Sequence, residues 1–162
     1  IEARKSGDAV RGASLFYSPA ISCAKCHDPK HGERLGPDLA SRREGVTDPF
    51  LIESILQPSK SVRKRFEQLS VITDEGLVVT GYQLKDKDGK LVLREPAAGK
   101  EITIDRDTIE ETMQSKTSAM PVGLANQLGT REQFLDIARF LMEIHEGGPS
   151  RLTELKRAAS KQ

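Results

Sequence analysis

The spacing of apolar residues predicts helices towards both ends of the chain. At the N-terminal end, Ser6 or Asp8 could cap a helix in which Val10, Ala13 and Tyr17 form one apolar stripe. A second helix is predicted from a cap at Asp48 to the proline at position 58, with proline at its first turn and an apolar face made by Leu51, Ile52, Ile55 and Leu56.

Near the C-terminal end, a short helix is predicted at 124–128 and a longer one after Thr130. Thr130 and Gln133 fit a capping box. The Gly-Gly-Pro sequence at 147–149 predicts the end of this helix, and residues 149–162 are expected to form a polar tail or linker, either as a frayed helix or as a linker stub. The apolar stripe of the longer helix is made by Phe134, Ile137, Ala138 and Leu141, with Ile144 or His145 extending it.

From Phe66 the apolar pattern changes to a period of two. Four alternating, β-branched segments follow, separated by turns rich in Asp, Pro and Gly. This pattern predicts an antiparallel β-meander of about four strands, inserted at about 66–105. The expected strands are 66–73, 77–85, 90–95 and 101–105.

Composition narrows the function without deciding it. The 162 residues carry a net charge of +1, from 25 basic and 24 acidic side chains, so no strong attraction to nucleic acid is implied. No apolar run is long enough for a transmembrane helix. Aromatic residues make up only 4% and tryptophan is absent, so a bound apolar group would help to fill the core. No signal peptide is visible and the chain begins with Ile1, so we expect a mature or excised piece.

The chemistry-bearing motif is CAKCH at 23–27, which contains both cysteines of the chain. A disulfide would leave His27 without a role. A thioredoxin-like site would need a preceding strand, whereas the preceding residues have a helical pattern. A structural zinc site would need a second ligand pair, and His31 and His145 have no suitable spacing.

Covalent haem attachment accounts for all three residues of the motif. Cys23 and Cys26 would add to the two vinyl groups of haem, and His27 would meet the iron from the same side. Residues i, i+3 and i+4 share one face of a helical turn, which is the geometry that this chemistry requires. The sequence therefore favours a c-type haem, one per chain, with its iron.

A second iron ligand is expected from a distant segment. Neutral thioether and imidazole groups both suit haem iron. Met120 is favoured because Pro121 follows it and biases its backbone away from helical angles, so that its side chain can be directed inward from a loop. The other possibilities are Met113, Met142, His31 and His145.

His27 also needs a partner for its second ring nitrogen, because metal-binding histidines usually donate that N–H to an oxygen. Pro37, in the LGPDL sequence at 35–39, keeps a carbonyl that can accept. Pro37 could equally be a simple turn proline, and the residues alone leave both roles open.

The order of the motifs resembles that of the Planctomycete/Verrucomicrobium-type haem-binding domain of the cytochrome c family. The motifs are, in order, CAKCH, GPDL, ESILQPS, the β-rich middle, SAMP and the terminal FLDIARFL helix. The resemblance runs from about Gly12 to Glu146. It implies a mostly α cytochrome c fold (class I), a single domain at 1–148 with the β-meander inserted between the third helix and the methionine loop. It also implies that Cys23 and Cys26 attach haem, that His27 and Met120 ligate iron, and that the Pro37 carbonyl orients His27.

A haem held on both sides predicts a one-electron carrier and not an enzyme. The alternatives are a gas sensor or peroxidase-like enzyme with a displaceable distal ligand, and a structural module that haem stabilises. Family members commonly end larger secreted proteins, often behind a dehydrogenase-like β-propeller. The resemblance thus implies periplasmic or other export, with redox proteins or a fused dehydrogenase domain as partners. Neither nucleic acid nor a membrane span is expected.

A basic run at 60–66 could neutralise haem propionates or contact an acidic partner, or it could be a solvated turn. Lys60 and Arg63 in this run, together with Arg43 from the earlier loop, are candidates for propionate contacts.

Overall fold

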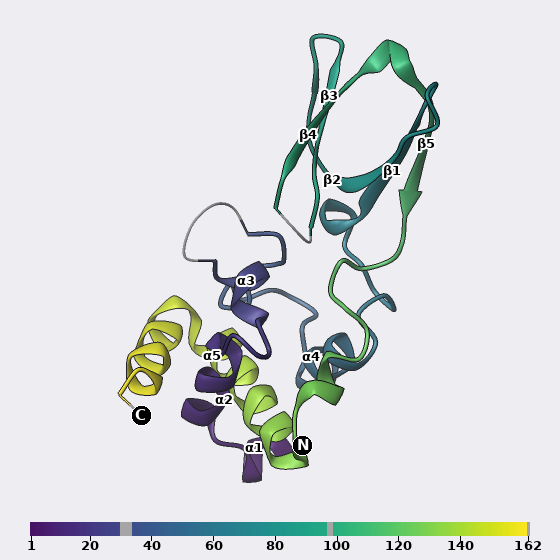
Figure 1. The fold of residues 1–162 in the computed structure, drawn as a ribbon. Coiled ribbons are helices and arrows are strands. Elements are labelled where there is room, and N and C mark those ends of the chain that lie inside the picture. Colours follow the sequence, from purple (N-terminus) through teal and green to yellow (C-terminus); the bar gives the residue numbers. More distant parts are fainter. Residues whose placement is uncertain (30–33, 97–98, 162) are drawn as a thin grey trace. The chain divides into compact units, whose positions relative to one another are not determined.

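The computed structural model describes residues 1–29, 34–96 and 99–161 (Figure 1). Its contacts divide the chain into two compact units. The helical unit consists of Ile1–Pro58 and Val122–Gln162, and the β unit consists of Ser59–Pro121.

In the helical unit, local capping sets where the helices begin. The Asp8 side chain accepts hydrogen bonds from the backbone N–H groups of Val10 and Arg11, which fixes the start of α2. At α4 the cap is Thr47, one residue before the predicted Asp48, and proline follows in the first turn. The elements are α1 (Glu2–Ser6), α2 (Ala9–Tyr17), α3 (Cys23–His27), α4 (Asp48–Leu56), η3 (Leu124–Gln127) and α5 (Arg131–Ala159).

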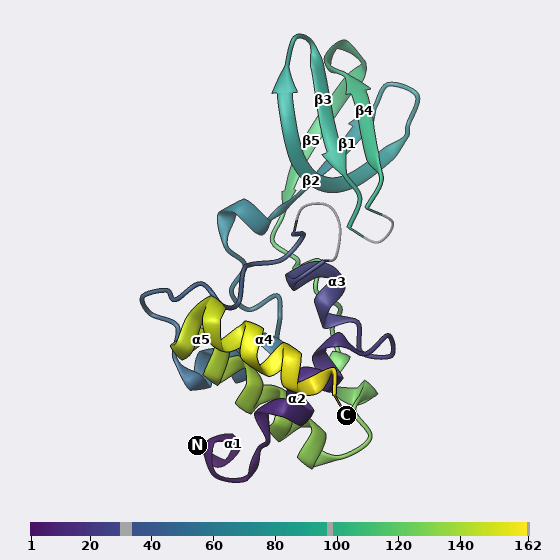
Figure 2. The same cartoon turned by 90° about the vertical axis from the view of Figure 1, so that its left-hand side faces the viewer.

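The central contact of this unit is the packing of α2 against α5 (Figure 2). At the crossing, a Cβ atom on Gly12 would lie 2.0 Å from the backbone oxygen of Asp136, so only glycine allows this approach. Beside it, the rings of Phe16 and Phe140 lie 5.1 Å apart between their centroids. Both phenylalanines are buried, and together they form the aromatic centre of the helical unit.

Helix α5 contains a kink at Gly148, which has φ 68° and ψ −159°. The predicted helix end at 147–149 is therefore a change of direction, and the helix resumes to Ala159, in the segment for which a frayed helix or a linker was expected. In this terminal segment (residues 150–159), Leu155 is only 2% exposed. Although α5 is 29 residues long, no helix of the described ranges is long and apolar enough to cross a membrane.

The β unit is a five-stranded antiparallel sheet with strand order β4-β3-β2-β1-β5. The register shifts twice, between Ile72 and Thr73 of β1 and between Gln83 and Lys85 of β2. Such bulges increase local bending, and the sheet is strongly curved (Figure 1). Its elements are η1 (Lys64–Phe66), β1 (Gln68–Thr73), β2 (Val78–Lys87), β3 (Lys90–Arg94), β4 (Glu101–Asp105), η2 (Arg106–Thr108) and β5 (Ile109–Ser115).

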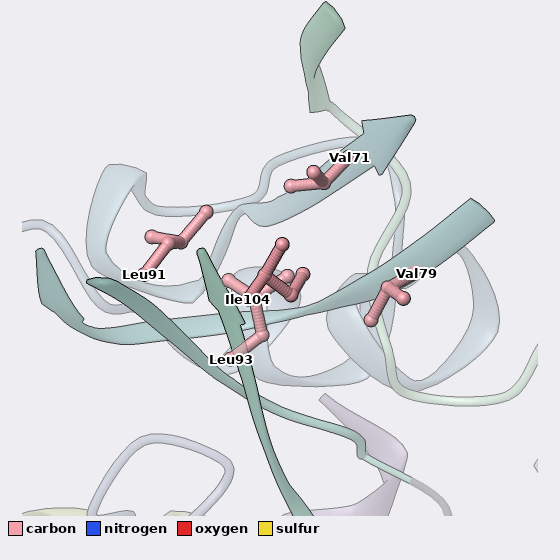
Figure 3. Packing of buried hydrophobic residues seen from close by; sticks show 5 residues of the cluster. All are labelled: Val71, Val79, Leu91, Leu93 and Ile104. Carbon is pink, nitrogen blue, oxygen red and sulfur yellow. The ribbon is translucent and has the colours of Figure 1, made fainter. Parts of the chain in front are cut away.

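The concave side of the sheet holds a hydrophobic core of its own (Figure 3). Leu69, Ile102 and Ile109 are partly buried against it. An independent core is what allows the inserted segment to be a compact unit. The buried members are Val71, Val79, Leu91, Leu93 and Ile104.

The prediction of a mostly α class I cytochrome c fold is wrong. The structure is 43% helix and 21% strand, with a five-stranded antiparallel sheet, which makes it a mixed α/β fold. The four strands predicted within 66–105 are present, but the sheet continues to Ser115 through β5. This fifth strand was missed because its residues are mostly polar and exposed, so that it lacks the alternation on which the prediction relied.

Candidate functional site

The CAKCH motif forms α3, a single helical turn in the helical unit. Ser22 precedes it with a left-handed backbone, φ 59° and ψ 19°, which turns the chain from α2 into the motif. Cys23 and Cys26 are both free thiols and are partly buried. Their i, i+3 spacing on the helix places both on one side of the turn.

Burial raises the pKa of both thiols, that of Cys23 to about 11. Both groups are therefore protonated at neutral pH. Thiol–disulfide catalysis requires the opposite shift, because the thiolate is the nucleophile. This pKa shift disfavours the thioredoxin-like alternative. The zinc alternative gains no support either, since the described residues contain no group of three or more His, Cys, Asp or Glu side chains that could hold a metal ion.

His27, at the end of α3, has its Nδ1 atom 2.9 Å from the carbonyl oxygen of Pro37. A carbonyl can only accept, so Nδ1 must carry the hydrogen and donate it. Nε2 is then the unprotonated nitrogen, with its lone pair available to a metal. Partial burial lowers the pKa of His27, although the Pro37 hydrogen bond opposes the shift. The neutral imidazole that a metal requires is thus the favoured form.

The loop that carries Pro37 lies tightly against α3. The backbone N–H of Gly36 donates to the carbonyl oxygen of Cys26 at 3.0 Å. A Cβ atom on Gly36 would lie 2.6 Å from Cε1 and 2.8 Å from Nδ1 of His27. Gly36 was not among the predicted site residues, although its neighbour Pro37 was.

Charged and polar groups surround the residue that follows His27. Asp28 accepts hydrogen bonds from the Tyr17 hydroxyl at 2.6 Å and from Lys156 Nζ at 2.8 Å. Burial acts to raise the pKa of Asp28, but the bonds from Lys156 and Tyr17 outweigh it, so that the pKa is lowered. No sequence signal linked Lys156 to the motif, because 128 residues separate it from Asp28.

The predicted second iron ligand, Met120, belongs to the β unit, whereas His27 belongs to the helical unit. Met120 is partly buried in the loop after β5, and its backbone N–H donates to the Ser118 hydroxyl at 3.1 Å. Met113 lies on β5 and is 57% exposed. Met113 and Met120 thus both belong to the β unit.

The remaining ligand candidates have other surroundings. Met142 is buried in α5, where it is 1% exposed. His145, also on α5, lines a surface hollow together with Met142 and Arg4. His31 lies outside the described residues. Among the basic candidates, Arg43 donates to the backbone oxygen of Asp38 at 2.7 Å. The other two, Lys60 and Arg63, lie in the β unit.

No protein-family model and no curated protein matches the chain. The resemblance to the Planctomycete/Verrucomicrobium-type haem-binding domain therefore stays a prediction that rests on the motifs of the sequence.

The described residues nevertheless fit a covalently attached haem. Two free, protonated thiols lie on one helical turn with a histidine directly after them. That histidine already uses Nδ1 in a hydrogen bond to a backbone oxygen, which leaves Nε2 for iron. A thiol pair and an oriented neutral imidazole are the donor set that c-type attachment uses.

Proposed function

We propose that the chain binds one haem covalently and transfers single electrons. The observation that carries this proposal is the hydrogen bond between His27 Nδ1 and the Pro37 carbonyl oxygen. A disulfide or a thioredoxin-like dithiol site has no need of a histidine held in one tautomer, whereas an iron site does. When bound, the haem supplies an iron that alternates between two oxidation states.

The protein residues have distinct roles in this proposal. Cys23 and Cys26 hold the haem through thioether bonds, so that it is retained in either oxidation state. His27 offers Nε2 to the iron, and Pro37 fixes the orientation of its ring. Gly36 lets the supporting loop approach the ring closely. None of these residues has to act as an acid or a base, and we propose an electron carrier without enzymatic activity of its own.

Met120 is proposed as the second iron ligand from its sequence setting before Pro121. A thioether ligand favours the reduced iron and raises the reduction potential. We further propose an exported protein, because thioether attachment takes place outside the cytoplasm, with redox proteins or a fused dehydrogenase domain as electron partners.

Production in the periplasm of a host with the haem-attachment machinery tests the proposal. The protein should retain haem in a denaturing gel, and its mass should exceed that of the polypeptide by one haem. Cys23→Ala and Cys26→Ala should each lose one thioether bond, and the double variant should lose covalent haem altogether. A chain that carries no covalent haem under these conditions would show the proposal to be wrong.

Carbon monoxide separates the electron carrier from a sensor or peroxidase-like enzyme. A reduced haem with two protein ligands should keep its spectrum when carbon monoxide is added. Rapid and complete carbon monoxide binding by the unmodified protein would instead favour the displaceable-ligand alternative.

A further inference from the structure

The carboxylate of Asp28, the residue directly after His27, is paired with a lysine from the other end of the chain. Lys156 Nζ lies 2.8 Å from Oδ2 of Asp28, which is the residue directly after the proposed iron ligand. The same carboxylate oxygen accepts the Tyr17 hydroxyl at 2.6 Å. Lys156 Nζ also lies 4.6 Å from the centroid of the Tyr17 ring. The ammonium group is thus held by a carboxylate and an aromatic face together.

The kink in α5 is what brings Lys156 to this position. The helix leaves its first direction at Gly148, and the terminal segment (residues 150–159) then packs back on the unit. Leu155, next to Lys156, is 2% exposed and anchors the segment. Across the kink, Arg151 Nε lies 2.9 Å from a carboxylate oxygen of Glu143. Two separate contacts therefore set the direction of the segment that carries Lys156.

The pairing of Lys156 with Asp28 adds little to the stability of the fold. The side chain of Lys156 is 52% exposed, and an ion pair this accessible to water contributes little to stability. Its charge acts at longer range than its hydrogen bond. A carboxylate next to an iron ligand stabilises the more positive, oxidised state, and a cation paired with that carboxylate cancels the effect.

We propose that Lys156 is a positioning residue that neutralises Asp28 beside the iron ligand and thereby sets the reduction potential of the bound haem. This inference rests on the proposed function. Arg34 is a weaker neighbour, because it lies 3.7 Å from Asp28 and also pairs with Asp38 at 2.8 Å. The C-terminal segment would then adjust the redox site instead of serving as a linker.

Potentiometric titration of the haem-loaded protein tests the inference. Lys156→Met should lower the midpoint potential, because the Asp28 charge is left uncompensated. Asp28→Asn should raise it, because the lysine charge then acts alone. The double variant, Asp28→Asn with Lys156→Met, should return close to the unmodified protein. Lys156→Arg should preserve the potential, and higher salt should diminish the Lys156→Met shift.

Lys161→Met is the matched control, since Lys161 is an exposed lysine just after the end of α5. It should leave the potential unchanged. Lys156→Gln provides a second neutral variant if the methionine variant folds poorly. The inference would be overturned if Lys156→Met and Lys156→Gln shift the potential no more than Lys161→Met does, even if their melting temperatures fall. That result would leave the proposed function intact. An unmodified protein that attaches no haem would overturn both.

Discussion

His27 and Pro37 are ten residues apart in the chain, yet the ring nitrogen of one and the backbone oxygen of the other lie 2.9 Å apart. The contact depends on Gly36, whose Cα approaches the imidazole so closely that no side chain fits between them. The loop thus fixes both the tautomer of His27 and the plane of its ring.

Replacement of Gly36 by alanine should therefore disturb His27 more than the overall fold. The added methyl group would lie 2.6 Å from Cε1, and either the ring or the loop must move. We expect Gly36→Ala to weaken or displace the axial histidine, with an altered haem spectrum and a lower yield of haem-loaded protein. Gly45→Ala is the control, because a methyl group added to Gly45 would meet no atom within 4 Å. The positive φ of Gly45 makes the alanine backbone mildly strained there. Equal spectra for both variants would argue against this role for Gly36.

The choice of Met120 over Met113 gives a paired prediction. Met120→Ala should open a coordination position, allow carbon monoxide to bind the reduced haem and lower the potential, because a thioether ligand is lost. Met113→Ala should leave the spectrum unchanged, since this side chain is 57% exposed on β5. Absorption spectra with and without carbon monoxide check both variants. If Met113→Ala changes the spectrum and Met120→Ala does not, the sequence-based choice is wrong.

Local signals predicted the elements better than their assembly. Pro49 and the apolar face of residues 51–56 correctly placed α4, and Thr130 accepts the Gln133 N–H at 3.3 Å as its capping pattern predicted. The capping box is incomplete, however, because the Gln133 side chain accepts from Gly129 N instead. Such signals act over a few residues, which is why a single sequence can reveal them.

The features that were missed depend on distant contacts. β5 is polar, and only its pairing with β1 makes it a strand. The contact of Lys156 with Asp28 requires the kink at Gly148, whose Gly-Gly-Pro sequence predicted an end and not a continuation. At the site, the three motif residues were identifiable from spacing, whereas the fit of Gly36 against the His27 ring required coordinates.

Acid should weaken the helical unit through Asp48. Both carboxylate oxygens of Asp48 accept from Arg4, at 2.8 and 2.9 Å, and this pairing lowers the pKa of Asp48. A carboxyl group whose pKa is lowered by folding stabilises the fold above its unfolded pKa of about 4, and this contribution is lost as the pH falls through the folded pKa. Asp48→Asn should therefore cost about 0.5–1 kcal/mol at neutral pH and show a shallower loss of stability below about pH 4.

Denaturant unfolding at several pH values measures this difference. Asp88→Asn is the matched control, since the Asp88 side chain is 81% exposed and its lysine neighbour is 4.0 Å away. It should follow the unmodified protein throughout. Parallel curves for Asp48→Asn and the unmodified protein between neutral pH and pH 3 would contradict the assigned role of the Arg4 pair.

The β unit should lose stability on its own when its core is opened. Leu93 is fully buried on β3 among Val71, Leu91 and Ile104, and truncation to alanine removes about 2–5 kcal/mol from a packed core. Because the contacts divide the chain into two units, Leu93→Ala should accelerate amide exchange in the strands, while α2 and α5 keep their protection.

Val78→Ala is the control on the same sheet: Val78 is 62% exposed, so its truncation should change stability by less than about 0.5 kcal/mol. Hydrogen exchange followed by mass spectrometry of proteolytic fragments resolves the two units. If amide exchange in α2 and α5 is accelerated as much as in the strands of Leu93→Ala, the two units unfold together. The loss of packing in the β unit would then also destabilise the helical unit.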